Sequence, residues 1–341
     1  MLFSAVSLYW AVSGVRQQQA ALEDPAWTKV KSSVAQITSF GQPVGLAVLV
    51  DARGYFLVHK SVVSGNQVTA SFGSNPTVLM TLTAVDDVTQ LALLKAENWI
   101  ENGQTVSHVT TTTTAGSKLI AATISGPVRG EFVTDQKVGQ MRPTLRYTPL
   151  SEIRLESNIG KVGGAMVFDQ QGQLVGVLGA TLTADENVAL GARGVGGSAL
   201  SGGAKAERVS AADNAVSKSA YGPQGMTVAY SLGPSVIKRV VDGLLSPDHK
   251  VKHPSVGLFF KSAGEPGARI EAVLDGTPAS EAGIKVGDLV TAVDGVPIRT
   301  QVEFAMQLFN HSVGDRITVT LRRGEQELTV TVVVGAQESL D

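Results

Sequence analysis

Short apolar segments separated by turn residues fill the chain between Val34 and Leu182, and this pattern constrains the fold more than any other feature of the sequence. The segments are rich in Val, Thr, Leu and Ile. Branched side chains favour extended backbone, and short strands at regular spacing are typical of β barrels and sandwiches. The pattern therefore predicts an all-β unit in the first half of the chain.

Two stretches of this unit have the form of a β hairpin. Residues 45–58 place two apolar runs around a turn at residues 51–54, and residues 164–180 do the same around residues 169–172. Asp and Gly in both turns favour tight chain reversal. Further strands are expected at residues 67–72, 91–95, 118–124 and 145–147.

The composition changes after these strands. Residues 183–222 are rich in Gly, Ala and Ser and hold too few apolar side chains to build a core, so we expect a flexible surface insertion there. Residues 225–232 predict a strand. Residues 234–245 predict a helix, because their apolar residues recur at helical spacing and Pro234 suits a first helical position. Residues 246–254 form a short polar hinge.

Residues 255–335 predict a separate α+β unit, in keeping with a chain of 341 residues that is long enough for two domains. Strands and helices alternate in this segment, and Asp294 and Gly295 form a dipeptide preferred in hairpin turns. The predicted strands cover residues 256–261, 268–274, 289–293, 316–322 and 327–334, and the predicted helices cover residues 278–282 and 302–310.

The N-terminal segment is apolar, with no charged residue in positions 2–15 before Arg16. A membrane-spanning helix needs about 20 apolar residues, and a secretory signal normally starts with basic residues, so the fit to either is partial. Three interpretations stay open: an uncleaved anchor whose start is short or misassigned, a cleaved signal, and a surface helix packed on the domain. Tyr9 and Trp10 favour the anchor, because aromatic side chains concentrate at membrane interfaces.

Charge and cysteine content exclude several kinds of site. The chain has 28 Lys and Arg against 30 Asp and Glu, so it has no strong field that would gather nucleic acid. It has no cysteine and therefore no disulfide or thiolate metal site. His108, His249, His253 and His311 stand singly, and the glycine-rich residues 191–203 lack the lysine and helix of a phosphate-binding loop. We expect no cofactor, no metal and no nucleic-acid partner.

Two motifs of the C-terminal segment resemble those of bacterial PDZ domains. GTPASEAGIKVGDLVTAVDGVPI (residues 276–298) is similar to their central motif, and SVGLFF (residues 255–260) resembles their carboxylate-binding loop and the strand that follows it. The resemblance implies that an extended peptide adds to a free strand edge while backbone N–H groups hold its terminal carboxylate. The helix at residues 302–310 would form the other side of this groove. The implied peptide-binding residues are Ser255, Val256, Gly257, Leu258 and Phe259.

Three upstream segments resemble, in order, the parts of HtrA-type trypsin-like serine proteases that carry the catalytic His, Asp and Ser. They are GYFLVHKSVV (residues 54–63), DDVTQLALLK (residues 86–95) and NIGKVGGAMV (residues 158–167). The resemblance implies a mainly β fold with a chymotrypsin-like double β-barrel followed by an α+β PDZ domain. The implied domains are residues 1–30 as hydrophobic anchor or signal plus linker, 31–246 as the protease-fold domain with its insertion at 183–222, and 255–335 as the PDZ domain.

In this register the three catalytic positions hold residues that cannot do the chemistry. Ser61 stands at the histidine position, Gln90 at the aspartate position and Val162 at the serine position. Acyl transfer needs a nucleophile, a base and a carboxylate that orients the base. Valine has no lone pair, glutamine has no charge and serine is not a base near neutral pH. The resemblance and these departures together predict a pseudoprotease.

Parts of the site persist around the missing groups. Gly160, Gly163 and Gly164 retain the loop that forms the oxyanion hole in the family. His59 lies two residues before Ser61, and in an extended strand this offset moves the ring by about 6.6 Å, too far for proton transfer at the family's position. An arrangement of Ser157 with Lys161 is an alternative that no motif supports.

The leading hypothesis is a catalytically inactive, envelope-located HtrA-like protein that binds polypeptides or protein C-termini as an adaptor, chaperone or regulator. The alternative is an active serine endopeptidase of envelope protein quality control with a non-standard site. A purely structural anchor is a third hypothesis. The family resemblance implies homo-trimers or hetero-oligomers with an active paralogue, and attachment to the membrane through the N-terminal segment.

Overall fold

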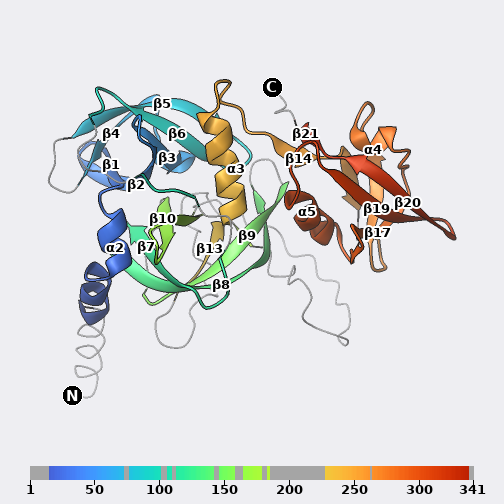
Figure 1. Cartoon of the computed structure of the whole chain (residues 1–341), viewed down its shortest axis with the longest axis horizontal. Coiled ribbons are helices and arrows are strands. Elements are labelled where there is room, and N and C mark those ends of the chain that lie inside the picture. The colour runs from blue at the N-terminus through green and yellow to red at the C-terminus, as the bar shows by residue number, and fades with distance from the viewer. Residues whose placement is uncertain are drawn as a thin grey trace, which may run out of the picture. The chain divides into compact units, whose positions relative to one another are not determined.

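The structure is a computed structural model that describes residues 15–72, 77–100, 106–109, 113–141, 146–157, 164–178, 183–184, 227–261 and 263–337. The chain forms two compact units. The first consists mainly of residues up to His249, and the second mainly of residues from Lys250 to Asp341. Figure 1 shows the elements of both.

The first unit opens with a closed β barrel. Its strands hydrogen-bond in the order β1-β2-β3-β6-β5-β4, and β4 pairs back with β1, so the barrel has no open edge. The hairpin predicted at residues 45–58 is β2 and β3. The strands are β1 (Val34–Ser39), β2 (Gln42–Asp51), β3 (Tyr55–His59), β4 (Gln67–Ser71), β5 (Val78–Asp86) and β6 (Leu91–Ala96).

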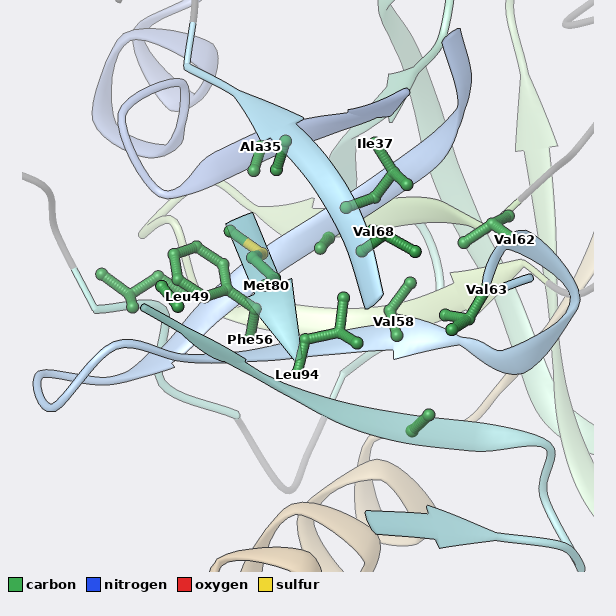
Figure 2. Close-up of a cluster of buried hydrophobic side chains, with 14 of the residues drawn as sticks. Ala35, Ile37, Leu49, Phe56, Val58, Val62, Val63, Val68, Met80 and Leu94 are labelled. Carbon is green, nitrogen blue, oxygen red and sulfur yellow. The ribbon is translucent and has the colours of Figure 1, made fainter. Parts of the chain in front are cut away.

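Apolar side chains from every strand of this barrel point into its interior (Figure 2). Alternate residues of a strand face the same side, so Phe56 and Val58 of β3 both enter the core. Phe56 is fully buried, and its ring centroid lies 5.3 Å from that of Trp99 and 5.5 Å from that of Phe72. Gly54 is needed beside this cluster, because a Cβ there would lie 2.4 Å from Trp99 Cγ.

A second barrel follows in the same unit. Its strands run in the order β8-β7-β10-β11-β13-β9, and β9 pairs with β8 to close it, while β12 (Thr183–Ala184) extends from β8. The strands are β7 (Lys118–Thr123), β8 (Gly126–Met141), β9 (Arg146–Leu155), β10 (Ala165–Asp169), β11 (Leu174–Leu178) and β13 (Thr227–Leu232). Helix α3 (Pro234–Leu245) contacts β11 of this barrel and β5 and β6 of the first, so its buried face joins the two.

The N-terminal helices attach to the second barrel. Residues 15–22 are helical, and α2 (Pro25–Val30) follows, with the Asp24 side chain accepting a hydrogen bond from the Ala26 N–H at 3.0 Å. Arg129 of β8 pairs with Asp24 at 2.8 Å. Among the residues that the structure describes, no helix is both long and apolar enough to span a membrane. The apolar residues 2–14 lie outside the described residues, so the three interpretations of that segment stay open.

The second unit is built around a sheet of order β15-β16-β17-β19-β20, with β18 (Val296–Pro297) paired to β17. A separate pair joins β14 (His253–Ser255) to β21 (Gly335–Gln337). Helices α4 (Pro278–Glu281) and α5 (Gln301–Phe309) complete the unit. The sheet strands are β15 (Leu258–Lys261), β16 (Ala268–Val273), β17 (Leu289–Val293), β19 (Arg316–Arg323) and β20 (Gln326–Val333).

The predicted fold class is confirmed: two β barrels precede a mixed α and β unit. The sequence analysis named no strand at β1, β5 or β8, and β9 extends to Leu155 where only residues 145–147 were expected. Polar residues interrupt the apolar residues of all three strands, so none of them has an apolar run longer than three residues. Of the predicted insertion, only β12 lies within the described residues.

Truncation of the barrel core tests this packing. Phe56→Ala removes a fully buried ring and should lower the free energy of unfolding of the first unit by about 3–5 kcal/mol. Phe40→Ala is the control, because Phe40 is fully exposed and its truncation should change that value by less than about 0.5 kcal/mol. Urea unfolding followed by circular dichroism measures both, and equal effects of the two substitutions would contradict the packing described.

Candidate functional site

His59 and Ser61 lie where β3 leaves the first barrel. β3 ends at His59, and the short 3-10 helix η1 (Lys60–Val62) follows directly. His59 is 1% exposed, whereas Ser61 is exposed. The Ser61 N–H donates to His59 Nδ1 at 3.3 Å, and Ser61 Oγ lies 2.7 Å from the same atom. The residue at the predicted histidine position is therefore a surface serine tied to a buried histidine.

These contacts set the protonation state of His59. Because a backbone N–H donates to Nδ1, that nitrogen is the acceptor of a neutral ring, and Ser61 Oγ donates to it as well. Burial lowers the pKa of His59 to about 4, since a charged ring would lose its hydration. Its Nε2 is buried and has no hydrogen-bond partner among the described residues. His59 is thus a weak base whose described hydrogen bonds come from Ser61.

Gln90 lies beside this segment, in the loop between β5 and β6. Its backbone carbonyl accepts a hydrogen bond from the Lys60 N–H at 2.7 Å, next to Ser61. The backbone of Gln90 has a φ of 59°, a strained value for a residue other than glycine. Its side-chain Nε2 donates to the Asp87 carbonyl at 2.8 Å. Gln90 therefore lies next to the segment of Ser61, where the family resemblance expects the catalytic aspartate. Its side-chain amide, however, is hydrogen-bonded within its own loop.

Asp86 ends β5 and directly precedes this loop. Its carboxylate is buried and accepts hydrogen bonds from the N–H of Thr89, at 3.1 Å, and from the Thr89 hydroxyl. Its backbone carbonyl accepts from the Gln90 N–H at 2.8 Å. Asp86 thus stabilises the loop that holds Gln90.

Gly164 belongs to the third of the protease-like segments, residues 158–167, and lies beside His59 and Val62. It has a φ of 66°, and a Cβ at this position would lie 3.3 Å from His59 Cβ and 3.7 Å from Val62 Cγ1. Gly160, Val162 and Gly163 lie outside the described residues, as does Lys161 of the Ser157 alternative. The structure therefore brings together Ser61, Gln90 and Gly164, and the position of Val162 stays a prediction.

The expected carboxylate-binding loop joins β14 to β15 in the second unit. Val256 is buried, and its carbonyl accepts a hydrogen bond from the Ala279 N–H at 3.0 Å. Gly257 has a φ of 79°, and a Cβ there would lie 2.3 Å from Thr277 Oγ1. The Gly257 carbonyl accepts from the Leu274 N–H at 3.0 Å. Only glycine fits at this position, because both the backbone conformation and the packing exclude a side chain.

Strand β15 and helix α5 flank the expected groove. β15 pairs with β16 on one side and, among the described strands, with none on the other. Phe260 of β15 packs against Phe304 of α5, with ring centroids 4.8 Å apart, so strand and helix lie side by side. Leu258 packs with Phe260 against the core of the unit, whereas Phe259 is 54% exposed.

The isolated histidines take structural positions. His249 Nδ1 lies 2.6 Å from the Leu244 carbonyl at the end of α3, and His311 Nε2 lies 3.1 Å from Asp294. Within the described part of the chain, no three His, Asp or Glu residues gather as they would around a metal ion.

Comparisons with known proteins agree with both parts of this geometry. A family model of the PDZ domain matches residues 250–334. The chain is 23% identical over 315 residues to "Serine protease Do-like HtrA" of Lactococcus lactis subsp. cremoris (strain MG1363), covering 84% of this chain and 68% of that protein. It is 30% identical over 132 residues to the "Probable periplasmic serine endoprotease DegP-like" of Brucella suis biovar 1 (strain 1330), covering 34% and 25%.

Solved structures show the same fold. "HtrA-type protease AlgW with decapeptide" matches with a TM-score of 0.58 and 15% identity, covering 92% of this chain and 98% of that one. The serine endoprotease from Yersinia pestis matches with a TM-score of 0.55 and 18% identity, covering 92% and 97%. The two barrels therefore have the chymotrypsin-like arrangement of these proteases.

The buried histidine makes the stability of the first unit depend on pH. Its folded-state pKa of about 4 lies below the unfolded value of about 6.5, so the unfolded chain takes up the proton first as the pH falls. The stability that neutral His59 contributes is therefore present above the unfolded-state pKa and is lost as the pH falls below it. The free energy of unfolding should decrease by on the order of 2 kcal/mol between pH 7 and pH 5.

Urea unfolding at the two pH values measures this loss. His59→Gln should reduce the difference, while His108→Gln, at an exposed histidine, is the control and should leave it as in the unmodified protein. A pH dependence that survives His59→Gln in full would show that other groups cause it.

Proposed function

We propose that this chain, which is similar to HtrA/DegP-type serine proteases and has a C-terminal PDZ domain, is a catalytically inactive member of that family that binds polypeptide C-termini. It would act in the cell envelope as an adaptor, chaperone or regulator. The observation that carries the proposal is the environment of Ser61 and Gln90, which the family resemblance aligns with the base and its orienting acid.

The geometry supports inactivity in two ways. The nearest imidazole, that of His59, is buried and neutral, and it accepts hydrogen bonds from Ser61 through Nδ1. A general base must take a proton and be stabilised when charged, whereas the hydrogen bonds described for the His59 ring come from Ser61 and not from a carboxylate. Val162, at the predicted nucleophile position, would leave the site without an attacking atom.

Peptide binding rests on the second unit. Its open strand edge, its glycine loop and the neighbouring α5 match the requirements of strand addition with carboxylate capture. Related structures described as HtrA-type protease AlgW with decapeptide and with tripeptide support a peptide as the ligand. Ser255, Val256, Gly257, Leu258 and Phe259 are the proposed contact residues.

Location and assembly complete the proposal. Relatives named as periplasmic support an exported or envelope location. A trimer, or a mixed oligomer with an active paralogue, is proposed from the family alone, and so is membrane attachment through the N-terminal segment.

The rival function is an active serine endopeptidase of envelope quality control. The hydrogen bond between the exposed Ser61 hydroxyl and His59 favours it, because a serine paired with an imidazole is the minimal nucleophilic arrangement. The relatives named above are also called proteases. Direct assay separates the two functions.

The purified protein should neither cleave unfolded casein nor react with a fluorophosphonate probe, since loss of the nucleophile alone costs a hydrolase on the order of a million-fold in rate. An active trypsin-like protease assayed in parallel is the positive control. Labelling that disappears in Ser61→Ala or Ser157→Ala would establish the rival function.

Gly257→Ala should abolish binding of fluorescent C-terminal peptides, because the added methyl would meet Thr277 in the loop that holds the carboxylate. Gly264→Ala is the matched control, since Gly264 has a φ of 70° but no atom within 4 Å of an added Cβ. Fluorescence anisotropy with a peptide library measures both. Absence of any bound peptide in the unmodified protein would leave only a scaffolding role.

A further inference from the structure

The face of β15 that points away from the core carries two side chains that do not point toward the core side of the strand. Phe259 and Lys261 are exposed, while the alternate residues Leu258 and Phe260 pack toward the core. The neighbouring strand does not cover them: Ala272 stands opposite Phe259, and Arg269 stands opposite Lys261. An exposed aromatic ring and an exposed cation therefore follow one another along the open edge.

Neither side chain has a partner that explains its presence. Arg269 forms an ion pair with Glu265, which also binds Arg322. Lys261 forms no ion pair with any residue that the structure describes. The ring of Phe259 likewise contacts no other aromatic ring among those residues. A phenyl ring left 54% exposed on a strand that accepts a ligand is available to contact that ligand.

The direction of the bound peptide follows from the loop. If the carboxylate lies at residues 255–257, before β15 begins, the peptide must run antiparallel to β15. Its last residue then lies opposite Leu258, its penultimate residue opposite Phe259 and its fourth residue from the end opposite Lys261. Side chains of directly opposite residues share a face of the sheet and touch one another.

We propose that Phe259 and Lys261 select among C-termini through these outward-facing positions. The preferred ligand has a bulky apolar or aromatic penultimate residue and a carboxylate side chain at the fourth residue from its end. The inference rests on the proposed peptide-binding function and adds a specificity that the groove side of the strand does not provide. Paired aromatic rings and opposite charges are the cross-strand pairs that stabilise sheets.

Two labelled decapeptides that differ in one residue test the penultimate position, one ending Glu-Ala-Phe-Val and the other Glu-Ala-Ser-Val. The unmodified protein should bind the first about three- to tenfold more tightly. Phe259→Ser should bring the two affinities within about twofold of each other, because the ring that pairs with the ligand is gone. Val286→Ser, at an exposed side chain outside β15, is the control and should keep the preference.

A charge exchange tests the fourth position. A third peptide ends Lys-Ala-Phe-Val, and the unmodified protein should bind it about two- to fivefold more weakly than its Glu counterpart at low salt. Lys261→Glu should reverse this order, and about 0.5 M salt should remove it. Arg316→Glu makes the same change of charge at an exposed residue of β19 and should leave the order as it was.

The outcomes separate the inference from the function on which it rests. Peptides that bind the unmodified protein equally well whatever their penultimate and fourth residues would overturn the specificity and leave the proposed function standing. Absence of binding by all three peptides and by the peptide library would overturn both. A change of oligomeric state in Phe259→Ser, measured by analytical ultracentrifugation without any change of peptide affinity, would make this face a contact between copies of the chain and would also overturn the inference.

Discussion

The pairing of β3 with β6 is the constraint on which the candidate active site depends. In this antiparallel ladder His59 stands opposite Leu91, so the residues that follow His59 and the residue that precedes Leu91 must lie together. The hydrogen bond from the Lys60 N–H to the Gln90 carbonyl continues the ladder beyond the last paired residues. Closure of the barrel therefore fixes the backbone frame of the candidate site through main-chain hydrogen bonds.

His59 has a structural role in the candidate site. It caps the start of η1 by accepting the Ser61 N–H, as a helix-capping side chain does, and it is buried, with Gly164 close to its Cβ. Such a ring stabilises local structure in its neutral form. The same burial that makes it a good structural group makes it a poor proton acceptor near neutral pH.

Much of this organisation was predictable from sequence because it rests on local patterns. Turn residues predicted the hairpin of β2 and β3, and helical spacing with Pro234 predicted α3 at its observed bounds. The strands β5 and β8 were missed because threonines or charged residues interrupt their apolar residues, and a barrel stabilises such strands through its ladders as well as through buried side chains.

The hydrogen bonds of the candidate site were harder to foresee. The family resemblance implied that Ser61, Gln90 and the Gly164 loop meet, but not that Ser61 would hydrogen-bond to the imidazole of His59 or that Gln90 would bond to Asp87. Those partners depend on backbone conformations, such as the positive φ of Gln90, that no local pattern in the sequence specifies. The pairing of β14 with β21 was missed for a different reason, since it joins segments far apart in sequence by a ladder of three residues a side.

That short ladder has a consequence for how the peptide loop behaves. Ser255, the first residue of the loop, pairs with Gly335, whose Cα lies so close to Pro278 that an added Cβ would be 3.0 Å from its Cγ. The start of the peptide loop is thus held in place by β21, at the other end of the domain sequence. A truncation that removes Gly335 would loosen the loop without removing a ligand contact, so an intact β21 would strengthen the binding of peptide.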